Sequence, residues 1–130
     1  MKVQYPIFIE PGTDKTAWGI IVPDLPGCFS AADEEGDVLA HAREAILLHL
    51  EGEEAIPEPS SLSELRGDPE YAGFIISLVD VDLSAIEGPA KRINVTIPAG
   101  LLARIDAVAK QRGMTRSAFL GSAALREIGS

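Results

Sequence analysis

The sequence predicts an α+β protein made of two parts, a sheet domain in residues 1–88 and a smaller strand-helix-helix module in residues 89–130. Two observations support this fold class. Apolar residues alternate with a period of two in the first thirty residues and again in residues 73–83, which is typical of strands. They recur with helical spacing in residues 37–51 and in residues 99–128. The charge also changes sign close to the predicted boundary.

The net charge of the chain is −9, but it is unevenly distributed. Residues 1–90 hold four basic residues and 18 of the 20 acidic ones, which gives −14, and residues 91–130 hold the other seven basic and two acidic ones, which gives +5. Such asymmetry predicts a tail that binds phosphate and a front domain that binds a basic partner. The chain has no secretory signal and no apolar run near the roughly 18 residues of a membrane span, so we expect a cytoplasmic protein without a membrane part.

The front domain begins with three predicted strands. Val3, Tyr5, Ile7 and Ile9 form one apolar face of the first, and Pro6 lacks an N–H, which favours an edge strand. A turn at residues 11–15 precedes a second strand at 18–22, and a proline corner at 23–27 precedes a third near 28–31.

A helix and a fourth strand complete the front domain. Asp37 is the expected N-cap of the helix, whose apolar stripe comprises Val38, Leu39, Ala42, Ala45, Ile46 and Leu50. Residues 61–64 match a capping box for one short helical turn, and residues 73–83 form a clear β run. The front domain is therefore predicted as β-β-β-α-β, followed by a linker at residues 84–90.

The basic tail has the pattern of one strand and two helices. Ile93, Val95 and Ile97 share one face of the predicted strand, and polar side chains share the other. Pro98 suits the first turn of a helix that ends at Gly113 and carries an apolar stripe of Leu101, Leu102, Ile105, Val108 and Ala109. Thr115 is the expected N-cap of a second helix over residues 116–128, with a buried side of Phe119, Leu120, Ala123, Ala124 and Ile128.

About forty residues of this kind cannot bury a sufficient core alone, and one strand has no ladder partner. We therefore expect a homodimer, or a tetramer if front domains pair two dimers, in which two strands form an antiparallel ribbon that fits the major groove of DNA. Arg92, Asn94 and Thr96 would face base edges, and the remaining predicted DNA ligands are Lys91, Thr115, Arg116 and Ser117, the last three at a helix N-terminus suited to phosphate. An alternative is a dimerisation module without DNA contacts, which the polar face and the positive charge disfavour.

The tail resembles the ribbon-helix-helix repressors over residues 91–128. The resemblance lies in the strand Arg92-Ile93-Asn94-Val95-Thr96-Ile97-Pro98, the turn Gly113-Met114-Thr115-Arg116-Ser117 and the following Ala118-Phe119-Leu120. It implies binding of palindromic operator DNA by a dimer, and association with the nucleoid when operator is bound.

The front domain resembles the HicB antitoxin family. The matching features are Tyr5, Trp18, the corner at residues 22–28, the helix at 36–51 and Ile56-Pro57-Glu58-Pro59-Ser60. The loop at residues 30–35 and Ala40-His41 depart from the family pattern. The resemblance implies a fold like a truncated ribonuclease H domain, which binds a small basic HicA toxin that cleaves mRNA. Candidate toxin contacts are Trp18, Asp24, Leu25, Pro26, Phe29, Asp33, Glu34 and Glu35.

We do not expect catalysis, a metal or a cofactor. A ribonuclease H-like fold raises the alternative of a magnesium site made by Asp24, Asp33, Glu34 and Asp80. The simpler interpretation is that Asp24 orders the proline corner, residues 33–37 form a solvated loop with a helix cap, and Asp80 and Asp82 lie on the outer face of the sheet.

Two further residue types are weak candidates for chemistry. His41 and His49 share a helix but lack a third metal ligand, and Cys28 has no evident base beside it. The alternative function is therefore another binding function, a dimeric repressor that senses a small ligand and has no toxin partner.

Overall fold

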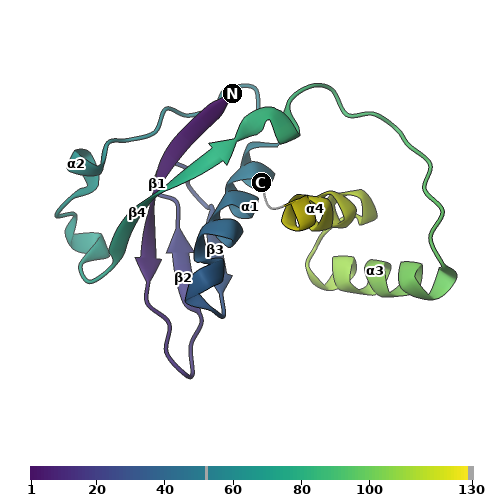
Figure 1. Ribbon diagram of the computed structural model, residues 1–130, viewed down its shortest axis with the longest axis horizontal. Helices are drawn as coiled ribbons and strands as arrows, with labels where there is room; N and C mark the ends of the chain where they lie inside the picture. The colour runs from purple at the N-terminus through teal and green to yellow at the C-terminus, as the bar shows by residue number, and fades with distance from the viewer. Residues whose placement is uncertain (52, 129–130) are drawn as a thin grey trace.

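The computed structural model describes residues 1–51 and 53–128, and a four-stranded antiparallel sheet forms its centre (Figure 1). The strand order is β3-β2-β1-β4, with bounds β1 (Lys2–Glu10), β2 (Trp18–Ile21), β3 (Phe29–Ala32) and β4 (Ile75–Asp82). Helix α1 (Val38–Leu50) follows β3 and the one-turn helix η1 (Glu35–Asp37). The predicted β-β-β-α-β order is confirmed, with short helices added before and after β4.

The hydrophobic core lies between α1 and one face of the sheet. Tyr5, Ile7 and Ile9 of β1 point into it, as the period-two pattern predicts, and they meet buried residues of α1 and β4. The α1 contribution differs slightly from the predicted stripe, because Leu47 is buried and Leu39 is exposed. The Tyr5 hydroxyl donates a hydrogen bond to the carbonyl oxygen of Pro57, so this buried polar group is satisfied.

Strand β1 is not an edge strand, so the prediction drawn from Pro6 was wrong. β1 lies between β2 and β4. Its pairing with β4 extends from Lys2 to Ile9, whereas β2 pairs only with Phe8, Ile9 and Glu10. Pro6 therefore lies in the half of β1 that has a ladder partner on one side only. A missing N–H is tolerated there for the same reason that it is tolerated at a sheet edge.

Aromatic side chains cover the outer face of the sheet at β1. Phe8 stacks on Tyr71 with ring centroids 4.0 Å apart, and Phe74 meets Phe8 edge-on at 6.5 Å. Tyr71 ends the one-turn helix η2 (Pro69–Tyr71), which follows α2 (Leu62–Leu65). Both faces of β1 are therefore buried, which the alternating pattern did not indicate.

Local capping residues set several element boundaries as predicted. The Ser61 hydroxyl accepts a hydrogen bond from the backbone N–H of Glu64 at 3.3 Å, which confirms the capping box at the start of α2. Asp37 occupies the N-cap position of α1, but its side chain makes no capping hydrogen bond. The one-turn helix η1 leads directly into α1 instead.

The tail folds into two helices, α3 (Ala99–Gln111) and α4 (Arg116–Ile128). Pro98 is the N-cap of α3, one residue before the predicted position. Gly113 follows the helix with φ +67°, and the N–H groups of Gly113 and Met114 bond the carbonyls of Lys110 and Ala109. These two bonds form a Schellman motif, which explains why glycine ends the helix.

The segment between the two parts carries no regular structure after η3 (Leu83–Ile86). Residues 87–98 run as an open loop from the sheet domain to α3 (Figure 1). The strand expected at residues 92–97 is not formed in the single chain, because no second strand is present to complete a ladder. The boundary at residues 88 and 89 stays a prediction.

Helix α4 packs against α1, but not through the predicted side. Leu125 contacts the main core and Ser122 is buried, whereas Ala123, Ala124 and Ile128 are exposed. Of the predicted apolar side, Phe119 and Leu120 are partly buried and the other three residues are uncovered in the single chain. Among the described residues, no helix has the length and apolar character needed to cross a membrane.

We predict that the α1 core face dominates the stability of the front domain. Replacing the fully buried Ile46 by alanine (Ile46→Ala) should lower the free energy of unfolding by about 2–5 kcal/mol, since it leaves a cavity beside the sheet. The matched control is Leu39→Ala on the exposed side of the same helix, which should cost well under that. Urea unfolding monitored by circular dichroism measures both, and equal losses would contradict this assignment of the core.

Candidate nucleic-acid and partner interfaces

The predicted DNA-binding segment is fully accessible. The side chains of Lys91, Arg92, Asn94 and Thr96 are all exposed, and they lie on the loop that precedes α3. The intervening apolar residues are also exposed: Ile93 is 75% and Val95 61% accessible. Exposed apolar residues that lie close together are typical of surfaces that bind a partner, so this row is a candidate interface.

A hollow of about 910 Å³ lies between this segment and the two tail helices. Its lining combines the row Ile93, Val95 and Ile97 with Leu102 of α3 and Leu120 of α4. Apolar side chains from three separate segments therefore surround an open space. This arrangement can receive an apolar element from another molecule.

The turn before α4 is held by its own hydrogen bonds. The Thr115 hydroxyl accepts a bond from the Ala118 N–H at 3.1 Å, which confirms the predicted N-cap. Arg116 donates two bonds to the Asp106 carboxylate, at 2.9 and 2.8 Å, and so joins α4 to α3. Ser117 is exposed. Thr115 and Arg116 were both predicted as phosphate ligands. In the structure, Thr115 caps α4 and Arg116 binds α3.

The Arg116 hydrogen bonds and charge lower the pKa of the Asp106 carboxyl below its usual range. We predict that Arg116→Gln moves this pKa up toward the ordinary aspartate value. A lowered pKa means that the ion pair stabilises the fold above the ordinary aspartate pKa and is lost as the pH falls through the lowered one. An NMR titration of the Asp106 side-chain carbon measures the shift. Arg104→Gln on the same helix is the control, and an unmoved Asp106 pKa in Arg116→Gln would exclude the pairing.

In the front domain, the proline corner is a closed turn. The N–H of Val22 bonds the Cys28 carbonyl at 3.1 Å, and Gly27 adopts φ +83°. Leu25 is 1% exposed in the core, so in this conformation it is unavailable as the predicted toxin contact. Asp24 accepts hydrogen bonds from the backbone N–H and the hydroxyl of Ser60. Asp24 therefore fastens the corner to the acidic loop before α2.

Other candidate toxin contacts form an exposed strip at β3. Phe29 is 66% accessible at the start of this edge strand, and Pro26 is exposed in the corner just before it. Asp33, Glu34 and Glu35 are exposed directly after the strand. Trp18, which pairs with Ala32 in the β2–β3 ladder, is half-buried and packs on the core. An exposed aromatic ring at one end of β3 and three exposed carboxylates after its other end suit a basic partner.

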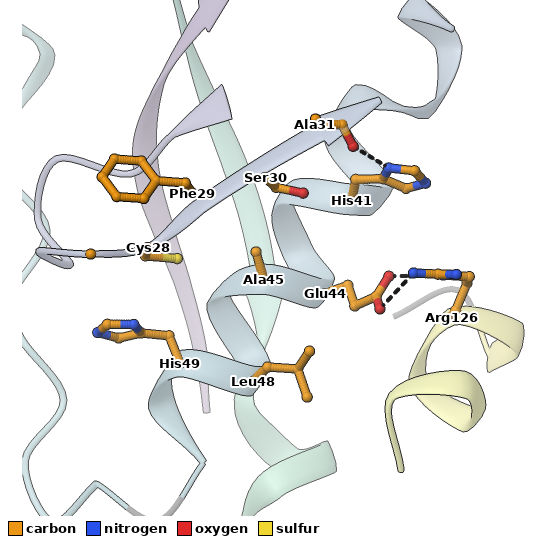
Figure 2. Close-up of a pocket in the computed structure, with 11 residues that line it drawn as sticks. Cys28, Phe29, Ser30, Ala31, His41, Glu44, Ala45, Leu48, His49 and Arg126 are labelled. Carbon is orange, nitrogen blue, oxygen red and sulfur yellow. Dashed lines mark hydrogen bonds and ion pairs between the residues drawn. The ribbon is translucent and has the colours of Figure 1, made fainter. Parts of the chain in front are cut away.

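A groove of about 490 Å³ separates β3 from α1 (Figure 2). Phe29 and Cys28 lie along one wall, His49 and Ala45 along the other, and Arg126 closes one end. Cys28 is 4% exposed, and burial raises the pKa of its thiol to about 11, which disfavours the nucleophilic thiolate.

The possible metal ligands are not gathered into a site. One His41 ring nitrogen, Nδ1, lies 2.7 Å from the Ala31 carbonyl oxygen of the edge strand. Asp24 is bound to Ser60, and the Asp80 carboxylate accepts a bond from the Gln4 amide. Across residues 1–51 and 53–128, no group of three histidine, cysteine, aspartate or glutamate residues has a metal-binding arrangement.

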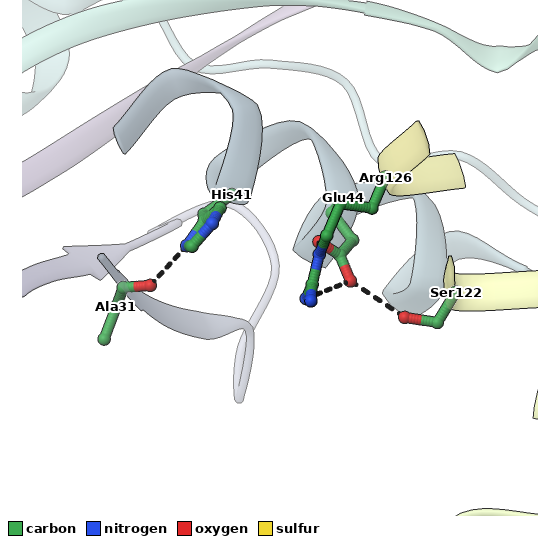
Figure 3. Close-up of polar contacts among 5 residues, drawn as sticks. All are labelled: Ala31, His41, Glu44, Ser122 and Arg126. Atoms are coloured by element: carbon green, nitrogen blue, oxygen red, sulfur yellow. Dashed lines mark hydrogen bonds and ion pairs between the residues drawn. The ribbon is translucent and has the colours of Figure 1, made fainter. Parts of the chain in front are cut away.

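One polar cluster was not anticipated from the sequence. Glu44 of α1 is buried and accepts bonds from three donors on α4: Ser122 Oγ at 2.8 Å, Arg126 Nη2 at 2.9 Å and Arg126 Nε at 3.0 Å (Figure 3). Its partners lie 78 and 82 residues away along the chain. The spacing of residues within α1 does not indicate these partners. The only available signal was that Glu44, a charged residue, lies beside the apolar stripe, where it would need a polar partner.

The two parts together present two candidate binding surfaces, one on an acidic front domain and one on a basic tail with an exposed apolar row. The chain belongs to the family of HicB-like antitoxins of bacterial toxin-antitoxin systems, whose family model matches residues 5–124. This membership confirms the family resemblance of the front domain.

The chain is also similar to individual proteins and solved structures. A protein described as an uncharacterized 14.9 kDa protein in the rep-hol intergenic region of Haemophilus phage HP1 (strain HP1c1) is 44% identical over 106 residues, 78% of each chain. The crystal structure of the Burkholderia pseudomallei antitoxin HicB matches with a TM-score of 0.59 and 41% identity, covering 95% of this chain and 96% of the other. A chain of the HicA3 and HicB3 toxin-antitoxin complex matches with a TM-score of 0.53 and 29% identity, covering 62% and 99%.

Proposed function

We propose that the chain is the antitoxin of a type II toxin-antitoxin pair. Its front domain, a truncated ribonuclease H-like fold without catalysis, binds and neutralises a HicA-type mRNA interferase. Its tail represses its own operon by binding a palindromic operator. The observation that carries the proposal is the exposed row Ile93 and Val95 in a chain of the HicB-like family. The protein then acts in the cytoplasm, on the nucleoid when operator is bound.

The tail becomes a DNA-binding unit when two chains pair. Residues 92–97 of both copies form an antiparallel ribbon, and Ile93, Val95 and Ile97 fill the hollow above the helices. Arg92, Asn94 and Thr96 then project from the opposite face toward base edges in the major groove. Lys91 and Ser117 contact phosphate, together with the Thr115 backbone and the Arg116 N–H groups left over from Asp106.

The front domain holds the toxin through the strip around β3. Phe29 is the central apolar contact and Pro26 extends it, because both are exposed on one side of the corner. Asp33, Glu34 and Glu35 attract and orient a basic toxin. Of the other predicted contacts, Trp18 holds β2 against β3 and Asp24 holds the proline corner to Ser60, so both keep the strip in place. Blocking the RNA-binding face of the toxin is then sufficient for neutralisation, without any reaction.

We predict that Arg92→Ala and Asn94→Ala each weaken binding to the operator before this operon by about 1–3 kcal/mol, because each removes a base contact. Arg104→Ala, an exposed arginine of α3, should leave sequence-specific affinity nearly unchanged. Gel-shift titration at fixed salt, against operator and scrambled DNA, gives the affinities. Equal operator affinity for all three variants and the unaltered chain would eliminate the ribbon.

We predict that Phe29→Ala weakens toxin binding by about 2 kcal/mol or more, as truncation of a central aromatic contact usually does. Leu78→Ala, on the opposite edge strand β4, is the matched control and should bind normally. Affinity for the basic protein encoded beside this chain and rescue of growth on co-expression are the two readouts. Failure of the unaltered chain to rescue growth would refute the antitoxin role and leave the ligand-sensing repressor.

A further inference from the structure

The Glu44 cluster holds the tail onto the front domain. The Glu44 side chain is 11% accessible, so its carboxylate has little contact with water, and it depends on Ser122 and Arg126 for hydrogen bonds. A buried carboxylate that loses its cation is strongly destabilised. The docked position of α4, which shields this carboxylate from water, therefore depends on a cation at Glu44.

Arg126 itself is easily displaced. Its side chain is 55% accessible, and it lies in the last turn of α4, where helix ends fray. Because more than half of this side chain already contacts water, moving it fully into water costs less than moving a buried arginine. The two partners of this ion pair are unequal, because Glu44 needs a cation and Arg126 does not need Glu44.

The groove beside β3 leads to this ion pair. Phe29 lines it on the sheet side, Leu48 and His49 line it on α1, and Glu44 and Arg126 form its end (Figure 2). It is thus continuous with the strip at which the basic toxin docks in the proposed function. The front domain, with its net charge of −14 from 18 acidic and four basic residues, favours a cationic side chain in this position.

We propose that Glu44 is an exchange site: on binding, a lysine or arginine of the basic toxin enters this groove and takes the carboxylate from Arg126. Helix α4 is then released from α1, and the tail moves independently of the front domain. This inference rests on the proposed toxin-binding function, and it adds the route by which toxin binding reaches the DNA-binding tail.

The exchange predicts that two substitutions change the affinity for toxin in opposite directions. Arg126→Ala removes the competitor and should tighten toxin binding, whereas Glu44→Gln removes the acceptor and should weaken it, each by about five- to tenfold. A purely structural ion pair would give shifts of the same sign. Arg104→Ala is the control for loss of a tail arginine and should give no shift. Calorimetric titration of the full chain with the protein encoded beside it, inactivated as a toxin, measures all four affinities.

Small-angle scattering of the full chain without toxin provides the second measurement. Glu44→Gln and Arg126→Ala should both enlarge the particle, with circular dichroism showing unchanged helix content. Shifts of one sign, no shift in affinity, or unchanged dimensions in both variants would overturn the exchange site. Toxin binding by every variant with equal affinity leaves the antitoxin role standing, whereas no binding by the unaltered chain overturns both proposals.

Discussion

The tail contains more apolar surface than it can bury by itself, and this constraint governs the arrangement of the whole chain. Among the described residues of its two helices, only Ile105 and Ala109 are buried apolar side chains. Helix α4 resolves part of the excess by packing Leu125 on the front domain. The rest, including Ile93, Val95 and Ile128, stays exposed on other sides of the module. One surface of the tail is thus covered within the chain, and another is left uncovered, where we propose that a second copy packs.

The contact between the two parts is polar at its centre, which distinguishes it from the core beneath α1. A purely hydrophobic contact would not depend on nearby charges. The Glu44 carboxylate, in contrast, makes the docking of α4 on α1 depend on a cation. The opposite net charges of the two parts favour the docked arrangement. The front domain can therefore bind or release α4 without any change in its own hydrophobic core.

Local patterns in the sequence were sufficient for the elements that are fixed by neighbouring residues. The capping box at residues 61–64, the glycine at the end of α3 and the Thr115 cap are all settled within one helical turn. The features that were missed depend on distant residues. Tyr71 covers Phe8 from a separate segment, and Glu44 meets α4 across 78 residues. Leu25 is buried because the proline corner closes on itself. The sequence does not indicate this, because the residues on either side of Leu25 are of types that are usually exposed.

The basic residues of the tail that have no acidic partner among the described residues show where this acidic chain could approach DNA. Of the seven basic residues of the tail, Arg116 is bound to Asp106, Arg126 to Glu44, and Arg112 lies over the Phe119 ring at 5.8 Å. The other four, Lys91, Arg92, Arg104 and Lys110, are exposed. Arg92 belongs to the polar face with Asn94 and Thr96, and Lys91 precedes it, so two of these four exposed charges lie at the proposed ribbon. In the proposed DNA complex each chain would then neutralise few phosphates, and sequence-specific contacts would have to supply a large share of the operator affinity.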